Sequence, residues 1–210
     1  MERFFPWLES VPCKEVIWIA GNHDFALESP LPPSGRSRVH YLEDSGLTVH
    51  GLKFWGSPWV KPVGEGSWAF SIGEHIEAEE VDAGYLPALA RSDSGRVVTM
   101  REHSRQNGGN LAQVFARIPE DIDVLITHSP PRGVCDDGVY PFERQHYGSQ
   151  VLRERIEQIQ PKLHICGHIH EGYGQGRIGQ TTVANVARMD AFYRPLNPVM
   201  TFDIQPKEDK

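Results

Sequence analysis

The chain has 210 residues, of which 39% are hydrophobic, and a formal net charge of −7 at pH 7. This length suits one domain with a sizeable core, and the acidic balance argues against a surface that wraps nucleic acid, because proteins that bind the phosphate backbone carry basic patches. No apolar run approaches the ~18 residues that cross a bilayer, so we expect no membrane span.

The three cysteines, Cys13, Cys135 and Cys166, are scattered along the chain without a C-x-x-C spacing. This pattern favours a reducing compartment over a disulfide framework or a zinc knuckle. The first residues lack a basic region followed by an uninterrupted apolar stretch, which a secretory signal would need. We therefore expect a cytoplasmic protein.

The predicted elements alternate between strands and helices along the chain. Two amphipathic helices are predicted at 110–118 and 151–159, where apolar residues recur at the spacing of one helix face. Short runs rich in β-forming residues predict strands at 16–20, 48–55, 124–127, 163–166, 181–186 and 199–204. This order predicts an α/β layered fold with antiparallel strands added toward the end.

One stretch interrupts this order, at residues 64–109, which are rich in Gly, Ser, Glu and Arg. A helix at 78–90 is the one regular element expected there, and the remainder is typical of a surface insert or lid. We predict a single domain over residues 1–210 with this irregular insert.

Three polar clusters directly follow apolar strand candidates. Asn22, His23 and Asp24 follow the first strand, His128 follows the strand at 124–127, and the GHIH segment follows the strand at 163–166. In open α/β sheets, ligands bind beyond the carboxyl ends of the strands. Imidazole nitrogens and amide oxygens suit Mn²⁺, Fe²⁺ or Zn²⁺. A lone histidine is more often a satisfied core residue, but three clusters at strand ends favour a metal site.

These segments resemble a known family. GNHD, the histidine of THSPPRGVCD, and GHIH within IQPKLHICGHIHEGYG are similar to the later motifs of the calcineurin-like metallophosphoesterases. The likeness is greatest to the group of metallophosphoesterase domain-containing proteins and class III cyclic-nucleotide phosphodiesterases. The resemblance implies a layered αββα sandwich. It also implies a hydrolase that acts on small phosphoesters, a class that includes nucleotides.

The resemblance also implies the metal ligands. Asn22, His128 and His168 would bind one ion and His170 the other, with two divalent transition metals, Mn, Fe or Zn, in the complete site. The implied reaction is attack on phosphorus by a metal-bound hydroxide.

His23 would then lie beside the leaving group, oriented by Asp24, although Asp24 could equally be a turn-former. Arg132 and His146 are weaker candidates for substrate contacts, and a solvated arginine is the simpler interpretation of Arg132. Three tryptophans that lie close together in the sequence could stack on a nucleobase or pack in the core: Trp55, Trp59 and Trp68.

Two family motifs, D-x-H and G-D-x-x-D or E, occur nowhere in the chain. Two dications about 4 Å apart repel by roughly 16 kcal/mol at an effective dielectric of 20, and the candidate ligands are all neutral. We therefore expect at most one ion on this chain and an N-terminally incomplete fold. The alternative is a truncated or degenerate, non-catalytic relative that acts as a metal-binding or interaction protein.

Overall fold

The computed structural model describes residues 3–27, 38–62, 68–74, 89–91, 97–99, 110–139 and 143–206. Its helical elements are α1 (Phe4–Ser10), η1 (Phe25–Leu27), α3 (Leu111–Ala116), α4 (Gln150–Ile159) and η3 (His170–Gly172). Its strands are β1 (Val16–Trp18), β2 (Val39–Tyr41), β3 (Ser45–Val49), β4 (Leu52–Ser57), β5 (Leu89–Arg91), β6 (Val97–Thr99), β7 (Val124–Thr127), β8 (Asp137–Val139), β9 (Arg144–His146), β10 (Leu163–Cys166), β11 (Gly174–Ile178) and β12 (Thr181–Asn185).

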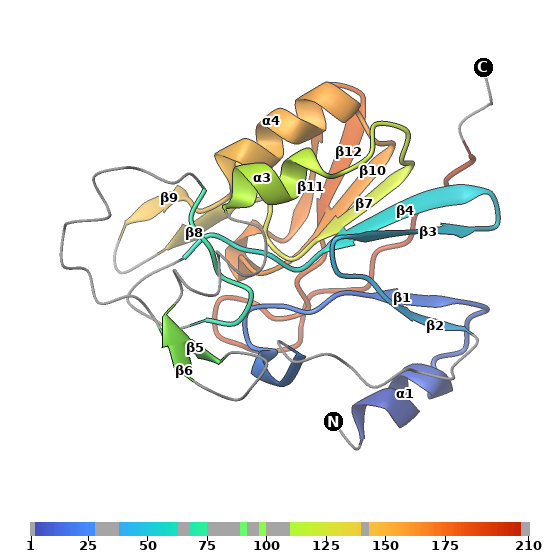
Figure 1. Cartoon of the computed structure of the whole chain (residues 1–210), viewed down its shortest axis with the longest axis horizontal. Helices are drawn as coiled ribbons and strands as arrows, with labels where there is room; N and C mark the ends of the chain where they lie inside the picture. Colours follow the sequence, from blue (N-terminus) through green and yellow to red (C-terminus); the bar gives the residue numbers. More distant parts are fainter. Residues whose placement is uncertain are drawn as a thin grey trace.

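A six-stranded mixed sheet forms the centre of the fold, in the order β11-β12-β10-β7-β4-β3 (Figure 1). The four inner strands run parallel, with Leu163 of β10 level with Val124 of β7 and with Thr182 of β12. The two outer strands, β11 and β3, are antiparallel to their neighbours. The parallel strands therefore bring their carboxyl ends to one edge.

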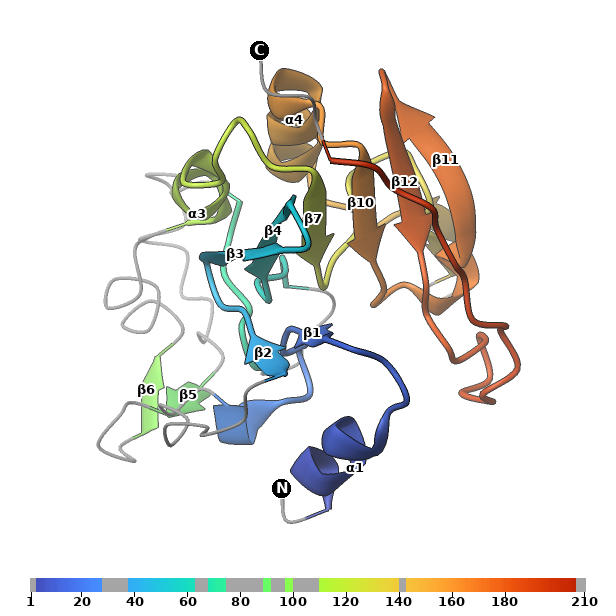
Figure 2. The same ribbon diagram turned by 90° about the vertical axis from the view of Figure 1, so that its right-hand side faces the viewer.

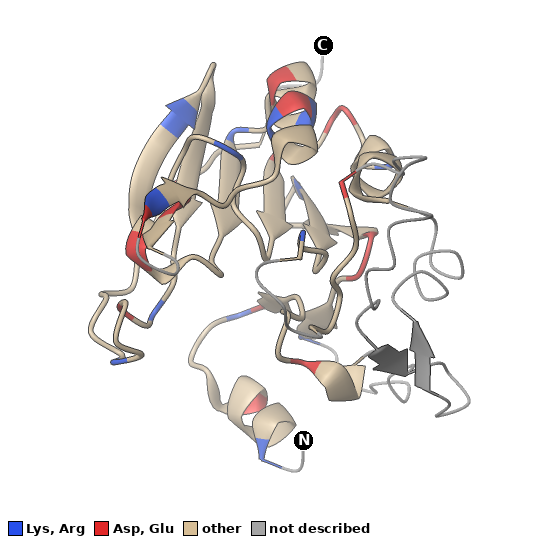
Figure 3. Ribbon diagram, turned by 90° about the vertical axis from the view of Figure 1, so that its left-hand side faces the viewer, with Lys and Arg blue, Asp and Glu red and all other residues tan. Residues whose placement is uncertain are grey.

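Helices α3 and α4 lie side by side over one face of this sheet (Figure 2). Their inward side chains, such as Phe115 and Ile156, are almost fully buried against the sheet. Burial of each such side chain contributes roughly 1.5–3 kcal/mol. Asn110 begins α3 with a capping box, and Ser149 begins α4 by accepting a bond from the Leu152 N–H. The outward surface of α4 carries acidic and basic residues together (Figure 3).

The opposite face of the sheet is covered by an extended segment near the C-terminus. Met200, Phe202 and Ile204 are half-buried and pack on the cluster around Val124 and Leu163. The prediction of a strand at 199–204 is therefore wrong, because this segment is extended but does not pair with the sheet. The alternation that suggested it reflects side chains that pack onto the face of the sheet, whereas a strand would need backbone hydrogen bonds along a sheet edge.

Strands β1 and β2 form a separate, parallel, two-stranded sheet. This small sheet approaches the central sheet closely at Gly56 of β4. A Cβ atom at Gly56 would lie 2.4 Å from the Leu42 Cβ and 2.8 Å from the Ile19 Cγ2. Glycine is therefore required for the two sheets to meet, and β1 ends near the same edge as the parallel strands.

Most of the predicted elements are present. The strands at 124–127 and 163–166 have the predicted bounds, and the two predicted helices correspond to α3 and α4. The helix expected at 78–90 lies largely outside the described residues, and 89–91 form strand β5. Within the part of the chain that the structure describes, no helix is both long and apolar enough to cross a membrane.

Candidate active site

The loop after β1 is a tight turn fixed by Asp24. The Asp24 carboxylate accepts a hydrogen bond from the Gly21 N–H at 2.7 Å, and the Asp24 N–H donates to the Gly21 carbonyl at 3.0 Å. Asn22 is buried, and its carbonyl accepts a bond from the Ala69 N–H. These bonds hold the Asn22 side chain at the carboxyl end of β1.

His128, at the end of β7, meets this turn directly. Its Nε2 lies 2.8 Å from the Asn22 Oδ1. When two donor atoms bind one transition-metal ion at about 2.1 Å each, with a right angle between the two bonds, they lie about 3 Å apart. The pair therefore has the spacing of two neighbouring ligands. A Cβ at Gly21 would lie 2.6 Å from the His128 Cε1, so only glycine leaves room for this ring.

His168 follows β10 and lies beside His128. The two rings are 4.9 Å apart between centroids, and the Gly167 N–H donates to the His128 carbonyl at 3.0 Å. The backbone of His168 has a φ of +67°, a conformation that is uncommon for non-glycine residues and is often found at functional sites. Its Nε2 is buried and has no hydrogen-bond partner among the described residues. An unpaired buried nitrogen of this kind fits a ligand to a metal ion.

Burial keeps both of these histidines neutral. Burial, together with a smaller effect of the neighbouring histidines, lowers the pKa of His128 to about 3 and that of His168 to about 4. A protonated imidazole cannot bind a metal ion, whereas a neutral one can. At neutral pH both rings are therefore in the state that ligation requires.

His170, on η3, is oriented by a backbone carbonyl. Its Nδ1 lies 3.2 Å from the Asp190 carbonyl oxygen, which can only accept, so Nδ1 carries the proton and Nε2 keeps its lone pair. The ring also packs edge-on against Tyr193, with centroids 4.8 Å apart. This is the arrangement in which a histidine presents Nε2 to a metal.

His23 is exposed and packs edge-on against Trp68, with ring centroids 5.0 Å apart. His23 lines a cavity of about 640 Å³, and the predicted metal ligands line the same cavity. The cavity is lined by Asn22, His23, Val60, Lys61, Trp68, His128, Gly138, Val139, Tyr147, Gly167, His168, Ile169, His170, Glu171, Ala187, Arg188, Met189, Ala191 and Tyr193. The structure thus brings Asn22 and four of the five predicted site histidines, His23, His128, His168 and His170, to one cavity.

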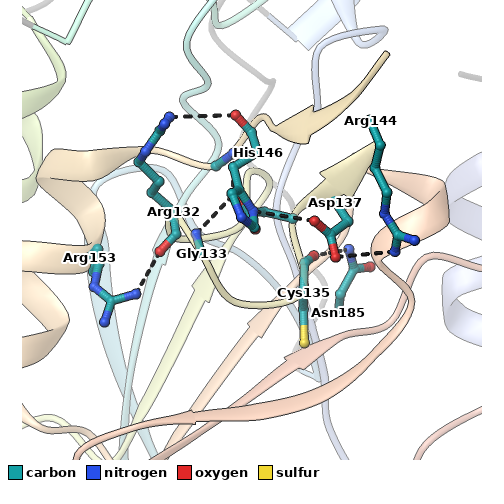
Figure 4. A network of polar contacts seen from close by, with 10 residues as sticks. Arg132, Gly133, Cys135, Asp137, Arg144, His146, Arg153 and Asn185 are labelled. Carbon is teal, nitrogen blue, oxygen red and sulfur yellow. Dashed lines mark hydrogen bonds and ion pairs between the residues drawn. The ribbon is translucent and has the colours of Figure 1, made fainter. Parts of the chain in front are cut away.

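Arg132 and His146 lie outside this lining, in the loop that precedes α4 (Figure 4). The Arg132 guanidinium is exposed and lies 3.5 Å from the His146 carbonyl. The His146 Nδ1 instead contacts Asp136 at 2.8 Å and Asp137 at 3.4 Å. Sequence reasoning missed this group of three possible donors, which lie within 4.8 Å of one another. The adjacent acidic pair in the CDDG segment was the available signal.

Imidazole nitrogens and an amide oxygen predominate among the possible metal donors around the cavity. Asn22, His128 and His168 supply neutral oxygen and nitrogen donors, a set suited to a borderline transition metal. Glu171 carries the one carboxylate among the described lining residues, and it is exposed.

A family model for calcineurin-like phosphoesterases matches residues 1–172. The chain belongs to the calcineurin-like phosphoesterase family. Members of this family are metal-dependent, typically with two divalent ions, and act on phosphoesters. The central mixed sheet, with the candidate metal ligands beyond its strand ends, agrees with this membership.

Within the family, the chain is 30% identical to metallophosphoesterase domain-containing protein 1 of Homo sapiens, over 97% of this chain and 59% of that protein. The Mus musculus protein of the same name matches equally. The UPF0046 protein C25E10.12 of Caenorhabditis elegans is 28% identical, over 96% of this chain and 66% of its own length. The chain thus spans about three-fifths of the length of the mammalian relatives.

Proposed function

We propose that this chain is a metal-dependent phosphodiesterase that acts on small phosphodiesters, nucleotides included. The observation that carries the proposal is the 2.8 Å approach of the Asn22 Oδ1 to the His128 Nε2, beside the unpaired Nε2 of His168. Family membership supports phosphoester chemistry, and the cavity of about 640 Å³ has the size of a small-molecule site.

Asn22, His128 and His168 would hold one divalent transition-metal ion, for which we propose Mn²⁺. His170 would contribute to a neighbouring position through its free Nε2. When bound, the metal supplies Lewis-acid activation of phosphoryl oxygen and of water. The protein keeps the His128 and His168 imidazoles neutral by burial, and it fixes the Asn22 turn through Asp24.

His23 is the proposed proton donor to the departing alkoxide. It is exposed to the cavity, and Trp68 restricts the orientation of its ring. Imidazole is suited to proton transfer near neutral pH. Asp24 acts on His23 through the shape of the turn, because the described hydrogen bond of its carboxylate goes to the Gly21 N–H.

Two cationic side chains, Lys61 and Arg188, also line the cavity. They would offset the charge of a phosphodiester that approaches the histidines. Because the chain has a net charge of −7, this local positive field and the bound metal would be needed to attract an anionic substrate.

The test uses the 210-residue chain loaded with Mn²⁺, with bis(p-nitrophenyl) phosphate as diester and p-nitrophenyl phosphate as monoester. We expect hydrolysis of the diester, and a loss of at least 100-fold in kcat/KM in His128→Ala and His168→Ala. His50→Asn is the matched control. It removes an exposed histidine from the β3–β4 turn, where φ is +50°, and asparagine tolerates that conformation.

Metal content is measured on the same samples. A folded chain that binds Mn²⁺ and hydrolyses neither ester would contradict the proposal. That outcome would favour the alternative, a non-catalytic relative that binds metal.

A further inference from the structure

The segment that follows β12 forms a closed loop at residues 187–197, here called the 187–197 loop. The Asn197 side-chain amide donates to the Ala187 carbonyl at 2.8 Å and to the Met189 carbonyl at 3.0 Å, which ties the two ends together. At its base, the Ala187 N–H donates to the side chain of Asn185. A compact surface loop closed in this way is a common carrier of function.

Asp190 organises the interior of the loop. Its carboxylate accepts hydrogen bonds from the Phe192 and Arg194 N–H groups, both at 2.9 Å, and forms an ion pair with the Arg194 guanidinium at 2.6 Å. Its backbone N–H donates to the Arg194 carbonyl at 2.9 Å. These bonds hold the loop in the described conformation.

This conformation places Tyr193 against His170, one of the proposed metal ligands. Tyr193 has a φ of +59°, which its Cβ disfavours, and its N–H donates to the Asp190 carbonyl that also fixes His170. The Tyr193 ring contacts the His170 ring edge-on at 4.8 Å, lines the cavity, and is still 73% exposed. A strained residue that holds a large ring open to solvent inside a cavity suggests a ligand contact.

The cavity wall also contains several apolar side chains. Met189 and Ala191 come from the same loop, and Val139 and Tyr147 come from the segment around the β8–β9 hairpin. A phosphate group alone would leave most of a cavity of about 640 Å³ unfilled. The space and the lining fit a flat organic group attached to the phosphate, for which an aromatic ring offers stacking without hydrogen-bond demands.

We propose that Tyr193 is a specificity-determining residue, which binds a planar aromatic group on the phosphoester substrate through its ring. This inference rests on the proposed function, and it narrows the substrate class to phosphoesters that carry an aryl group or a nucleobase. Phe192 is the natural comparison. Phe192 precedes Tyr193 in the chain and is 77% exposed. Its ring faces the Arg194 guanidinium and does not line the cavity.

The test measures binding rather than turnover, by calorimetry on the Mn²⁺-loaded chain with phenylphosphonate and methylphosphonate. These probes differ only in the ring. We expect wild type to bind phenylphosphonate more tightly, and Tyr193→Ala to lose roughly 5- to 100-fold in affinity for it, with methylphosphonate unchanged. Tyr193→Phe should restore the preference, and Phe192→Ala should keep it.

A second pair, adenosine 5′-monophosphate and ribose 5-phosphate, distinguishes a nucleobase from a simple aryl group. Loss of adenosine 5′-monophosphate affinity in Tyr193→Ala would identify nucleotides as ligands, and loss for phenylphosphonate alone would identify aryl esters. An unchanged preference in Tyr193→Ala, or equal losses for both phosphonates, would overturn the inference while diester hydrolysis stands. Failure of both phosphonates to bind, together with absent hydrolysis, would overturn the proposed function as well.

Discussion

At the scale of single residues, His164 shows how burial determines a protonation state away from the cavity. It is fully buried in β10, and its Nε2 lies 2.8 Å from the Thr127 Oγ1. The Thr127 hydroxyl donates to the Ser129 carbonyl, so it must accept from His164, and the His164 Nδ1 is left without a proton. That Nδ1 has no partner among the described residues.

We predict that His164 makes the fold sensitive to acid. Burial lowers its pKa from 6.5 to about 3, so the unfolded chain binds this proton more tightly than the folded one. The part of the free energy of unfolding that depends on neutral His164 is fully present above pH 6.5. It is lost as the pH falls toward 3, at about 1.4 kcal/mol per pH unit. Urea unfolding at several pH values should show the stability advantage of wild type over His164→Gln shrinking from pH 6 to pH 4. Parallel stability curves for the two proteins would contradict this account.

Gly21 offers a prediction about the geometry of the ligands. In Gly21→Ala the new Cβ would overlap the His128 ring, whose nearest atoms lie at 2.6–2.9 Å, so the ring must move away from Asn22. We expect a loss of about 1–3 kcal/mol in the free energy of unfolding and a 10- to 100-fold loss of Mn²⁺ affinity by calorimetry.

Gly167→Ala is the matched control for Mn²⁺ affinity. A Cβ at Gly167 meets nothing within 4 Å, although this residue also lies in a loop of the cavity. Equal losses of affinity in both variants would mean that backbone flexibility, and not the overlap with His128, determines the effect.

At the scale of elements, the loop between β7 and α4 depends on one buried carboxylate. Asp136 is 1% exposed, and its Oδ2 accepts bonds from the Gly133 and Gly148 N–H groups, each at 2.9 Å. Its Oδ1 contacts the half-exposed His146. This loop and the β8–β9 hairpin within it supply Val139 and Tyr147 to the cavity.

We predict that Asp136→Ala lowers the free energy of unfolding by about 2–4 kcal/mol, because two backbone N–H groups lose their acceptor. His146→Ala removes only the exposed partner and should cost less than about 1 kcal/mol. Urea denaturation of the two variants measures the difference. Similar losses would show that the Asp136–His146 pair, and not the backbone bonds, stabilises the loop.

The elements also show which parts of the fold the sequence reveals. Strands β7 and β10 are mostly apolar because they are buried in the middle of a parallel sheet, and this pattern predicted their bounds. Strand β11, GQGRI, was missed because its glycines carry no apolar pattern, although Gly176 is needed beside Val134. The segment at 199–204 was misassigned because alternation alone cannot distinguish pairing at a sheet edge from packing on its face.

Residues of the candidate site differ in the same way. His128 and His168 could be predicted to lie close together because each closely follows a parallel strand of one sheet, and such strands end at one edge. Asn22 follows β1 of the separate small sheet, so its place beside His128 depends on how the two sheets pack. Tyr193 and Asp190 could not, because their positions depend on hydrogen bonds inside an irregular loop that no periodic pattern records. Asp136 likewise acts through backbone N–H groups from distant positions in the chain.

At the scale of the whole molecule, the candidate ligands join two separate sheets. Asn22 follows β1 of the small sheet, whereas His128 and His168 follow β7 and β10 of the central sheet. Figure 2 shows the small sheet beneath the end of the central one. The sheets share no described strand pairing, and their contact at Gly56 relies on close packing of Leu42 and Ile19. A metal ion at the three ligands would therefore connect the two sheets.

This connection predicts that Mn²⁺ stabilises the molecule as a whole. A ligand that binds only the folded state at 100 times its Kd adds about 2.7 kcal/mol to the free energy of unfolding. We expect a stabilisation of this size in wild type, reversal by a chelator, and its absence at the same Mn²⁺ concentration in Asn22→Ala, measured by urea denaturation. Hydrogen exchange should also slow at residues 16–24, because the ion would hold the small sheet against the central one. If Mn²⁺ stabilised Asn22→Ala as much as wild type, or slowed exchange only in β7 and β10, the ion would bind to the central sheet alone.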